Sequence, residues 1–359
     1  MTPAKQGFFM PAEWQAHEAT WLAWPSNEED WPDKFAPIIW VYAEIIRVLT
    51  TSERVRLLVP NQAMIKAVET ILQRNHVDLS QVDSYPVATN RAWLRDSGPT
   101  ILINHNLEAH AYLLLDWHFN AWAKYADYDK DDKVASAIAD SIGAQIIQPT
   151  VVKQGKTTRV TLEGGAIDVN GKGTLLTTTE CLLSKTQARN PLLTRDDMEQ
   201  LFADYLAVSQ VIWLDHGIVG DDTHGHIDDI ARFVNDNTVI TVVETDRRDE
   251  NYAKLQANLQ QLKQAKDQDG KLLNVVELPM PSARRFDDTR LPASYANFLI
   301  ANKVVLVPTF NDANDRVALN ILAACFPDRA IVPINSTDLI WGLGAIHCLS
   351  QQQPLVIDA

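Results

Sequence analysis

Short apolar runs alternate with turn-prone residues along most of the chain, and longer amphipathic stretches lie between them. Four pairs of β-rich runs flank turns that begin at positions 104, 170, 235 and 301, with spacings of 66, 65 and 66 residues. Such a pair of runs around a short turn predicts a β-hairpin. Apolar residues at i, i+3 and i+4 predict helices over 129–142, 194–207 and 249–266. The pattern therefore predicts a repeated strand-hairpin-helix unit.

The chain has 359 residues, which accommodates five such units. We expect the fifth unit to combine a strand near Cys348 with N-terminal strands over 19–24 and 55–60. A closed ring of α/β units places corresponding strand ends around one axis, as the blades of a propeller do. The expected fold is therefore an α/β five-bladed propeller that forms one domain over 1–359.

Acidic residues recur at one phase of this repeat. Asp96 and Glu163 are 67 residues apart, Glu163 and Asp228 are 65 apart, and Cys348 follows after a further 120. The last interval is close to two repeats, so one repeat lacks an obvious chemical residue. Each acidic segment is set in strand-like sequence. A single acid is often only a turn or capping residue, but the shared phase predicts that these residues converge with His226 in one axial pocket.

Cys348 has the sequence context of a positioned thiol nucleophile. It follows an apolar segment and a Gly-x-Gly loop at 342–344, whose glycines let backbone approach a ligand, and it precedes three glutamines. A lone cysteine is more often structural than catalytic, so this thiol needs a base and a substrate clamp. We expect Cys181 and Cys325 to be small buried apolar residues. We expect His347 to face the opposite side of a strand and to be structural.

Six blocks spread over nearly the whole chain carry a family resemblance: 21–25, 92–100, 116–122, 162–168, 225–228 and 346–348. In these blocks the chain resembles the agmatine deiminase and bacterial peptidylarginine deiminase-like family. The resemblance implies the pentein fold, which is a five-bladed α/β propeller. It also implies that Cys348 is the nucleophile and His226 the general acid/base. Asp96, Glu163 and Asp228 would be the carboxylates around a guanidinium.

The chemistry of a guanidinium agrees with these roles. It is planar, cationic and rich in N–H donors, so carboxylates bind it in a bidentate manner. Trp93 would form a wall for the methylene chain of the substrate or a cation–π face for its charge. The resemblance favours agmatine, which would give N-carbamoylputrescine and ammonia without a metal or redox cofactor. Arg91 would repel the distal ammonium of agmatine or attract a carboxylate, so free arginine, peptidyl arginine and other guanidino compounds remain alternatives.

Two other classes of protein share part of this sequence pattern. The segment 223–229 resembles the Thr-His-x-His-x-Asp-His signature of metallo-β-lactamase-like zinc hydrolases. Asp229 stands where the last histidine is needed, and His347 is the one histidine after His226, which is too few for a two-zinc site. A non-enzymatic repeat scaffold that binds cationic peptides would explain the acidic charge, but not the combination of thiol, imidazole and carboxylates.

Composition limits the remaining partners and the compartment. The formal net charge of −14 argues against nucleic acid and mildly favours a cationic ligand. The N-terminal residues lack the apolar run of a signal peptide, and no stretch reaches the length that spans a bilayer. Three cysteines do not form a disulfide framework, so we expect a reducing cytoplasm. The sequence leaves a homo-oligomer open.

Overall fold

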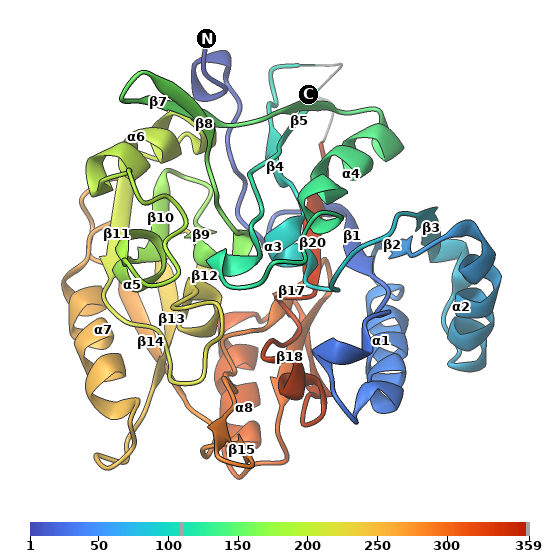
Figure 1. The fold of residues 1–359 in the computed structure, drawn as a ribbon. Helices are drawn as coiled ribbons and strands as arrows, with labels where there is room; N and C mark the ends of the chain where they lie inside the picture. The colour runs from blue at the N-terminus through green and yellow to red at the C-terminus, as the bar shows by residue number, and fades with distance from the viewer. Residues whose placement is uncertain (108–110, 357–359) are drawn as a thin grey trace.

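The computed structural model describes residues 1–107 and 111–356, and strands alternate with helices along the chain (Figure 1). Five sheets share one pattern, in which two strands pair antiparallel and the next strand along the chain pairs parallel after a helical connection. Four of them have three strands: β4 (Thr100–Ile103), β5 (Tyr112–Leu115), β6 (Gln145–Ile147); β9 (Asp168–Val169), β10 (Thr174–Thr178), β11 (Gln210–Leu214); β12 (Ala231–Asn235), β13 (Thr238–Val243), β14 (Asn274–Pro279); β17 (Leu299–Ile300), β18 (Val304–Thr309), β19 (Ala330–Asn335). This pattern is the predicted repeat.

The fifth sheet joins two distant parts of the chain. Its order is β20 (Ser350–Pro354), β1 (His17–Ala23), β2 (Arg54–Val59) and β3 (Val82–Pro86). β20 pairs antiparallel with β1, so that Trp21 lies opposite Gln351, and β1 pairs parallel with β2. The prediction that the strand near Cys348 combines with N-terminal strands is confirmed.

The hairpin predictions are confirmed with two corrections. The connection between β4 and β5 runs from 104 to 111, which is longer than the predicted turn, and residues 108–110 lie outside the described part of the chain. Only Asp168–Val169 of the predicted run 166–169 is a strand, because Gly164–Ala166 forms one turn of 3₁₀ helix. Two further pairs of strands form small ribbons: β7 (Thr150–Lys153) with β8 (Lys156–Arg159), and β15 (Arg285–Phe286) with β16 (Thr289–Arg290).

The longer helices connect the parallel strands and pack an apolar face against them. In α1 the buried side chains Ile38, Tyr42, Ile45 and Leu49 recur at helical spacing on one face. α6 begins with a capping box, in which Thr194 and Asp197 bond each other's backbone N–H. The helices of this kind are α1 (Phe35–Leu49), α2 (Gln62–Arg74), α4 (Val134–Ile142), α5 (Thr179–Leu183), α6 (Arg195–Leu206), α7 (Tyr252–Gln264) and α8 (Asp315–Cys325). The three predicted helices correspond to α4 with the 3₁₀ turn before it, to α6 and to α7.

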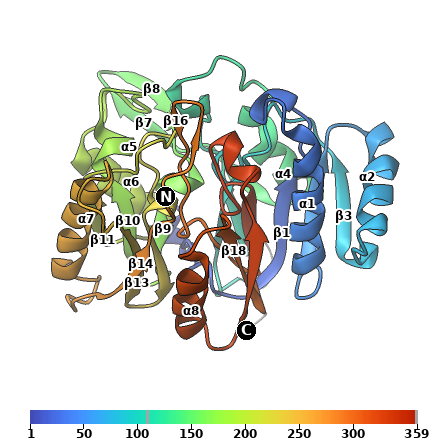
Figure 2. The ribbon, with the colours of Figure 1, turned by 90° about the horizontal axis from the view of Figure 1, so that it is seen from below.

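Shorter helical turns punctuate the loops. They are α3 (Leu94–Ser97), η1 (Ala4–Gln6), η2 (Glu28–Asp30), η3 (Leu79–Gln81), η4 (Ala121–Ala123), η5 (Asp131–Lys133), η6 (Gly164–Ala166), η7 (Ile227–Asp229) and η8 (Leu339–Gly342). α2 and α7 lie at opposite sides of the molecule, whereas α3 and β20 lie near its middle (Figures 1 and 2). The short turns next to the central strands are therefore the elements that position side chains near the middle of the molecule.

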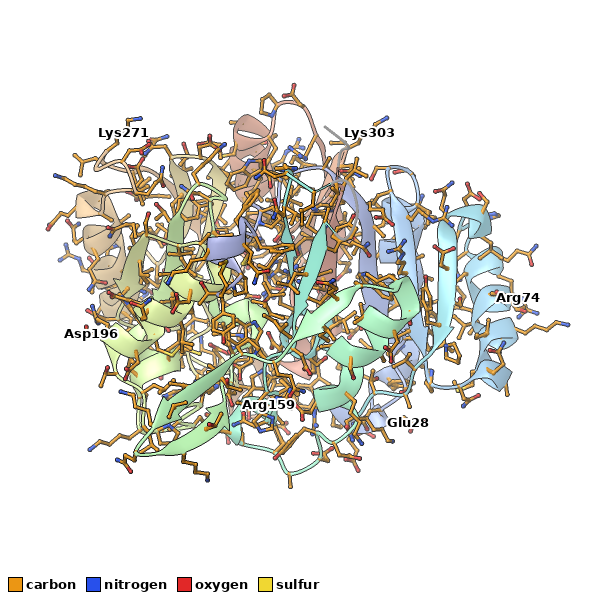
Figure 3. All side chains as sticks on the ribbon, turned by 90° about the horizontal axis from the view of Figure 1, so that it is seen from above. Glu28, Arg74, Arg159, Asp196, Lys271 and Lys303 are labelled. Carbon is orange, nitrogen blue, oxygen red and sulfur yellow. The ribbon has the colours of Figure 1, made fainter. Side chains whose placement is uncertain are left out.

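Apolar clusters pack between the sheets and the helices, and many charged side chains lie at the rim. Large side chains such as Trp21, Trp31 and Phe202 are fully buried in apolar clusters between the sheets and the helices. Charged side chains, among them Arg74, Asp196 and Lys271, project from the periphery (Figure 3). Within 1–107 and 111–356, none of the helices has the length and apolar character needed to cross a bilayer.

Candidate active site

The five predicted site residues occupy equivalent places in four of the sheets. Asp96 lies in α3 before β4, and Glu163 precedes η6 and β9. His226 and Asp228 lie at η7 before β12, and Cys348 lies in a turn before β20. The expectation that these segments are strand-like is wrong. They are short helical turns and loops that precede the first strand of a sheet.

The turns that carry Asp96 and Cys348 line a cavity of about 440 Å³, whereas Glu163, His226 and Asp228 are not among the described residues that line it. Asp96, Cys348, Trp93 and Trp122 are among the residues that line it. Cys348 is only 6% exposed, so a ligand that reaches its sulfur is largely removed from water. A cavity of this size suits a small molecule.

The Cys348 thiol touches an amide and a carboxylate. Asn297 Nδ2 lies 3.1 Å from Sγ, and Asp228 Oδ2 lies 3.7 Å from it. Burial and the surrounding carboxylates, first of all Asp228, raise the pKa of the Cys348 thiol well above its usual value. Burial and the neighbouring carboxylates therefore favour the protonated thiol over the thiolate at this position.

His226 is fully buried between two carboxylates. Its Nδ1 lies 3.7 Å from Asp96 Oδ1, and its Nε2 lies 3.7 Å from Glu163 Oε2. Burial would lower the pKa of His226, but the Asp96 carboxylate and the groups on the other side of the ring raise it well above its usual value. Neither ring nitrogen makes a hydrogen bond within the described residues. The neighbouring carboxylates therefore favour the protonated form of this ring.

Glycine at position 165 creates the space beside this ring. A Cβ atom there would lie 2.5 Å from His226 Nδ1, 2.9 Å from Asp96 Oδ1 and 3.1 Å from Asp228 Oδ2. No real side chain tolerates the shortest of these contacts. Gly165 therefore lets the imidazole and two carboxylates approach one another, and its backbone N–H donates to Asp96 Oδ1 at 3.1 Å.

Glu163 and Asp96 differ in charge state because they have different partners. Burial would raise the pKa of Glu163, but the Arg189 guanidinium, whose Nε donates to Oε1 at 3.0 Å, lowers it to about 2. Asp96 has no arginine partner among the described residues, and it faces the His226 ring at 3.7 Å instead. Burial raises the pKa of Asp96 to about 6, although Trp122 Nε1 donates to Oδ2 at 2.9 Å. Glu163 is a permanent anion, whereas Asp96 is ionised only above weakly acidic pH.

Asp228 is held by His347, whose predicted position is wrong. His347 does not lie on the far face of a strand; it is in the turn before β20, and its Nδ1 lies 2.7 Å from Asp228 Oδ2. Its Nε2 lies 2.8 Å from Glu13 Oε2. Burial would raise the pKa of Asp228, but the contact with His347 holds it below its usual value. The prediction that His347 is structural agrees with this bridging position.

Asn297 occupies the repeat that the sequence left without a chemical residue. It lies two residues before β17, and its side-chain oxygen accepts from the His347 N–H at 3.0 Å. Its Nδ2 also donates to Asp229 Oδ1 at 3.0 Å, and burial and the charge of Asp228 raise the pKa of Asp229 well above its usual value. Sequence analysis missed Asn297 because only acids were followed at this phase of the repeat.

Gly342 and Gly344 line the cavity, and they also allow the loop to pack closely against two tryptophans. A Cβ at Gly344 would lie 2.7 Å from the Trp93 ring, and one at Gly342 would lie 2.4 Å from Trp31 Nε1. The ring centroids of Trp31 and Trp93 are 5.3 Å apart. The loop therefore presses against two indoles that are tilted by 44° to each other, and Trp93 lines the cavity.

Four further acids line the cavity, and we call them the acidic mouth: Glu29, Asp30, Asp127 and Asp222. Arg91 also lies there, but its NH2 is 2.9 Å from Asp127 Oδ1 and its Nε is 3.5 Å from Asp30 Oδ1. Its guanidinium also stacks over Tyr125. Arg91 is thus occupied by protein partners, and Lys124 pairs with Asp222 in the same region. The carboxyl groups of the acidic mouth still outnumber these two cations.

The two histidines of the zinc-hydrolase-like segment have separate surroundings. His224 Nε2 lies 3.2 Å from Ser184 Oγ, and its Nδ1 faces Glu180. His226 instead faces Asp96 and Glu163. Neither of these arrangements corresponds to the shared two-zinc site of that motif.

The other cysteines differ from each other. Cys325 ends α8 and is half-buried, so the expectation that it is buried is only partly met. Cys181 is fully buried in α5, as expected. Its sulfur, however, lies beside Glu163 and His226, which was not foreseen.

Comparison with known proteins agrees with this geometry. Residues 9–354 match the family model of the Porphyromonas-type peptidyl-arginine deiminase. The chain belongs to this family. The chain is similar to the agmatine deiminase of Stutzerimonas stutzeri. The two sequences are 34% identical in an alignment that covers 98% of this chain and 97% of the relative.

Solved deiminase structures have the same fold. The agmatine deiminase of Enterococcus faecalis superposes with a TM-score of 0.88 at 32% identity, over 99% of this chain and 98% of that one. The C. jejuni agmatine deiminase with substrate bound superposes with a TM-score of 0.83 at 28% identity, over 98% of this chain and 97% of that one. The fold and the family of this deiminase-like chain are therefore established independently of its site.

Proposed function

We propose that this protein hydrolyses agmatine to N-carbamoylputrescine and ammonia through a covalent intermediate on Cys348. The observation that carries this proposal is a buried thiol in contact with Asp228, in a cavity that Asp96 also lines. The His226 imidazole, whose ring nitrogens have no hydrogen-bond partner among the described residues, lies beside Asp96. The agmatine deiminases to which the chain is similar support the same reaction.

Asp96 and Asp228 form the guanidinium clamp in this proposal. Asp228 Oδ1 is buried and has no hydrogen-bond partner in the described part of the chain, so it can accept from a ligand N–H. The Asp96 carboxylate lies in the cavity wall, and both Asp96 and Asp228 lie beside Gly165. Charge-assisted bonds to both carboxylates would fix the plane of the guanidinium and place its carbon near Cys348 Sγ.

In the first step, the bound cation favours loss of the thiol proton to solvent, because it offsets the negative charges that hold the proton on sulfur. The thiolate attacks the guanidinium carbon and a C–S bond forms. His226 gives its proton to the departing nitrogen, the C–N bond breaks, and ammonia leaves a thiouronium on Cys348. Glu163 stabilises the charged imidazole before this transfer.

In the second step, His226 is neutral and takes a proton from water. The resulting hydroxide attacks the thiouronium carbon, the C–S bond breaks, and the remaining hydroxyl proton returns to sulfur as the ureido product forms. Asn297 donates to Sγ at 3.1 Å and would stabilise the sulfur anion in both steps.

The acidic mouth favours agmatine over arginine. Agmatine carries an ammonium at the end opposite its guanidinium, whereas free arginine also carries a carboxylate. Arg91 is already paired with Asp30 and Asp127, so no free cation is offered to a carboxylate there. A carboxylate placed among these acids would meet like charge, which costs several kcal/mol when desolvated.

We also propose that the five sheets are the blades of a propeller around this site, and that 1–359 form one catalytic domain. The recurrence of site residues just before the first strand of a sheet supports this arrangement. A reducing cytoplasm would suit the unmodified Cys348 thiol.

The experiment compares agmatine, free arginine and an arginine peptide, with ammonia and ureido product measured together. We expect kcat/KM for agmatine to exceed that for arginine about 100-fold, the equivalent of about 3 kcal/mol. Cys348→Ser should lose essentially all turnover, while the matched variant Cys325→Ser should keep it. Turnover above a tenth of wild type in Cys348→Ser would remove the thiol from the mechanism, and a preference for the peptide would replace agmatine as the substrate.

A further inference from the structure

Three ligand-type atoms converge behind the catalytic imidazole. The Cys181 sulfur, a Glu163 carboxylate oxygen and a His226 ring nitrogen all lie within 4.8 Å of one another. All three side chains are fully buried. The mechanism above uses Glu163 and His226 but gives no role to the Cys181 thiol.

Two of these atoms are unpaired. Glu163 Oε2 and His226 Nε2 are buried without hydrogen-bond partners in 1–107 and 111–356, and they lie 3.7 Å apart. Two ligands of one tetrahedral zinc ion stand roughly 3.5 Å apart, since each bond is about 2.0 to 2.3 Å long. The spacing of the unpaired atoms therefore already suits a common metal ion.

Each ligand is held in place by a contact away from the cluster. Arg189 binds the other oxygen of Glu163, which leaves Oε2 directed at the ring. Thr178 Oγ1 accepts from the Cys181 N–H at 3.0 Å and donates to the Gly225 carbonyl, so the backbones that carry Cys181 and His226 are tied together. Outer contacts of this kind are what orient the ligands of metal sites.

The far side of the imidazole also fits a metal-ligating histidine. When one ring nitrogen binds a metal, the other is normally directed at a carboxylate or carbonyl oxygen. His226 Nδ1 faces Asp96 Oδ1 at 3.7 Å. A thiolate, a carboxylate and a neutral imidazole together carry two negative charges, which match a divalent cation.

From these contacts we infer that one thiophilic divalent cation of the zinc and cadmium class binds Cys181, Glu163 and His226 and inhibits the enzyme. The ion forms bonds to sulfur, oxygen and nitrogen, and the protons of the thiol and the imidazolium pass to solvent. Inhibition rests on the proposed function, because a metal-bound His226 can no longer give a proton to the leaving nitrogen. Binding itself does not depend on that role.

The binding test uses Cd²⁺ and follows the ultraviolet thiolate-to-cadmium charge-transfer absorption, with stoichiometry from calorimetry. Wild type should bind one ion per chain with this absorption. Cys181→Ser should abolish the absorption and weaken binding by at least the 10- to 100-fold that losing even an outer partner costs. Cys325→Ser and Cys348→Ser should both retain it. Cys181→Ala provides a second variant if the serine is poorly folded.

The activity test uses Zn²⁺ with agmatine. Zinc should inhibit wild type and Cys325→Ser, EDTA should restore the rate, and Cys181→Ser should need about 100-fold more zinc for the same fractional inhibition. Absorption that survives in Cys181→Ser but is lost in Cys348→Ser would put the ion on the nucleophile and overturn the inference. So would the absence of stoichiometric binding in wild type. If agmatine is not a substrate, the cadmium titration still reports on the site.

Discussion

At the scale of single residues, the proposed active site depends on the absence of a side chain at position 165. Gly165 has no Cβ, and this gap lets His226, Asp96 and Asp228 share one small volume. The φ angle of Gly165 is not in the left-handed region, so alanine could adopt the same backbone conformation. Its Cβ atom would nevertheless clash with His226 and Asp96. The position is therefore a direct test of how closely the three groups must approach.

Gly165→Ala should lower kcat about 100-fold, because displacing catalytic groups by about 1 Å has an effect of that order. The protein should remain folded. Gly155→Ala is the matched control: its φ is +76° and no atom lies within 4 Å of the added Cβ, so it should cost about 1 kcal/mol of stability and no activity. Steady-state kinetics and urea unfolding of both variants measure this. A Gly165→Ala enzyme with normal kcat would mean that these groups need not be in contact.

The raised pKa of Asp96 predicts that its carboxylate, which the proposed reaction needs, lowers the stability of the folded protein. Its pKa is raised to about 6, so the folded state binds its proton more tightly than the unfolded state does. The stability that protonation contributes is complete below about pH 4 and is lost as the pH rises to about 6. At neutral pH the buried anion therefore costs up to about 3 kcal/mol.

Asp96→Asn should consequently unfold at a higher urea concentration than wild type at pH 8, although it loses at least 100-fold in kcat/KM. The asparagine amide has one acceptor oxygen, whereas the Asp96 carboxylate accepts from both Trp122 Nε1 and the Gly165 N–H. The loss of one of these hydrogen bonds reduces the gain in stability. The difference between the two proteins should shrink or reverse at pH 4.5, where wild type is also neutral at this position. An equal difference at both values of pH would contradict the raised pKa.

At the scale of elements, the sequence was informative about regular structure and less so about short turns. The hairpins and the helices α6 and α7 were predicted because their patterns extend over many residues. α3 has four residues, which is about one turn, so no periodicity distinguishes it from the strand after it. The partners of Asn297 and His347 come from distant parts of the chain, and no local pattern records such contacts.

One turn in the site is strained. Ala121, Trp122 and Ala123 have φ angles of 49°, 59° and 53°, a conformation that costs about 1 to 2 kcal/mol for each residue other than glycine. Asn120 holds the turn, because its side chain accepts from the Ala123 N–H at 2.9 Å. This conformation directs the Trp122 indole N–H at Asp96.

Asn120→Ala should release this turn and separate Trp122 from Asp96. The hydrogen bond from Trp122 lowers the pKa of Asp96, so its loss should raise that pKa and move the acidic limb of kcat/KM to higher pH. Asn61→Ala removes a similar cap from α2 and should cost about 1 kcal/mol of stability. It should not move the acidic limb of the pH profile. Identical pH profiles for the two variants would show that the turn does not act through Asp96.

At the scale of the whole molecule, Glu13 ties the N-terminal segment to the centre of the protein. Its carboxylate meets Arg232 at 2.5 Å and His347 at 2.8 Å, and it accepts from the Ile300 N–H at 2.8 Å. Burial would raise the pKa of Glu13, but Arg232 and His347 lower it well below its usual value. The stability contributed by this anion is present above pH 4.5 and is lost as the pH falls.

Glu13→Gln should cost about 3 to 5 kcal/mol, because it leaves the buried Arg232 without one of its carboxylates. Glu18→Gln is the control in the same segment. Glu18 pairs with Arg56 nearer the surface, so its loss should cost less than about 1 kcal/mol. Urea unfolding at pH 7 compares them, and equal losses would show that the central pairing adds nothing to the surface one.

The pairing of β20 with β1 also has a consequence for biosynthesis. A ribosome delivers β1 early and β20 more than 300 residues later, so the backbone edge of β1 that β20 will cover stays open during most of translation. The same late segment carries Cys348, the proposed nucleophile. A nascent chain therefore lacks this thiol, and its β1 edge is exposed to wrong strand pairing, until β20 has been synthesised.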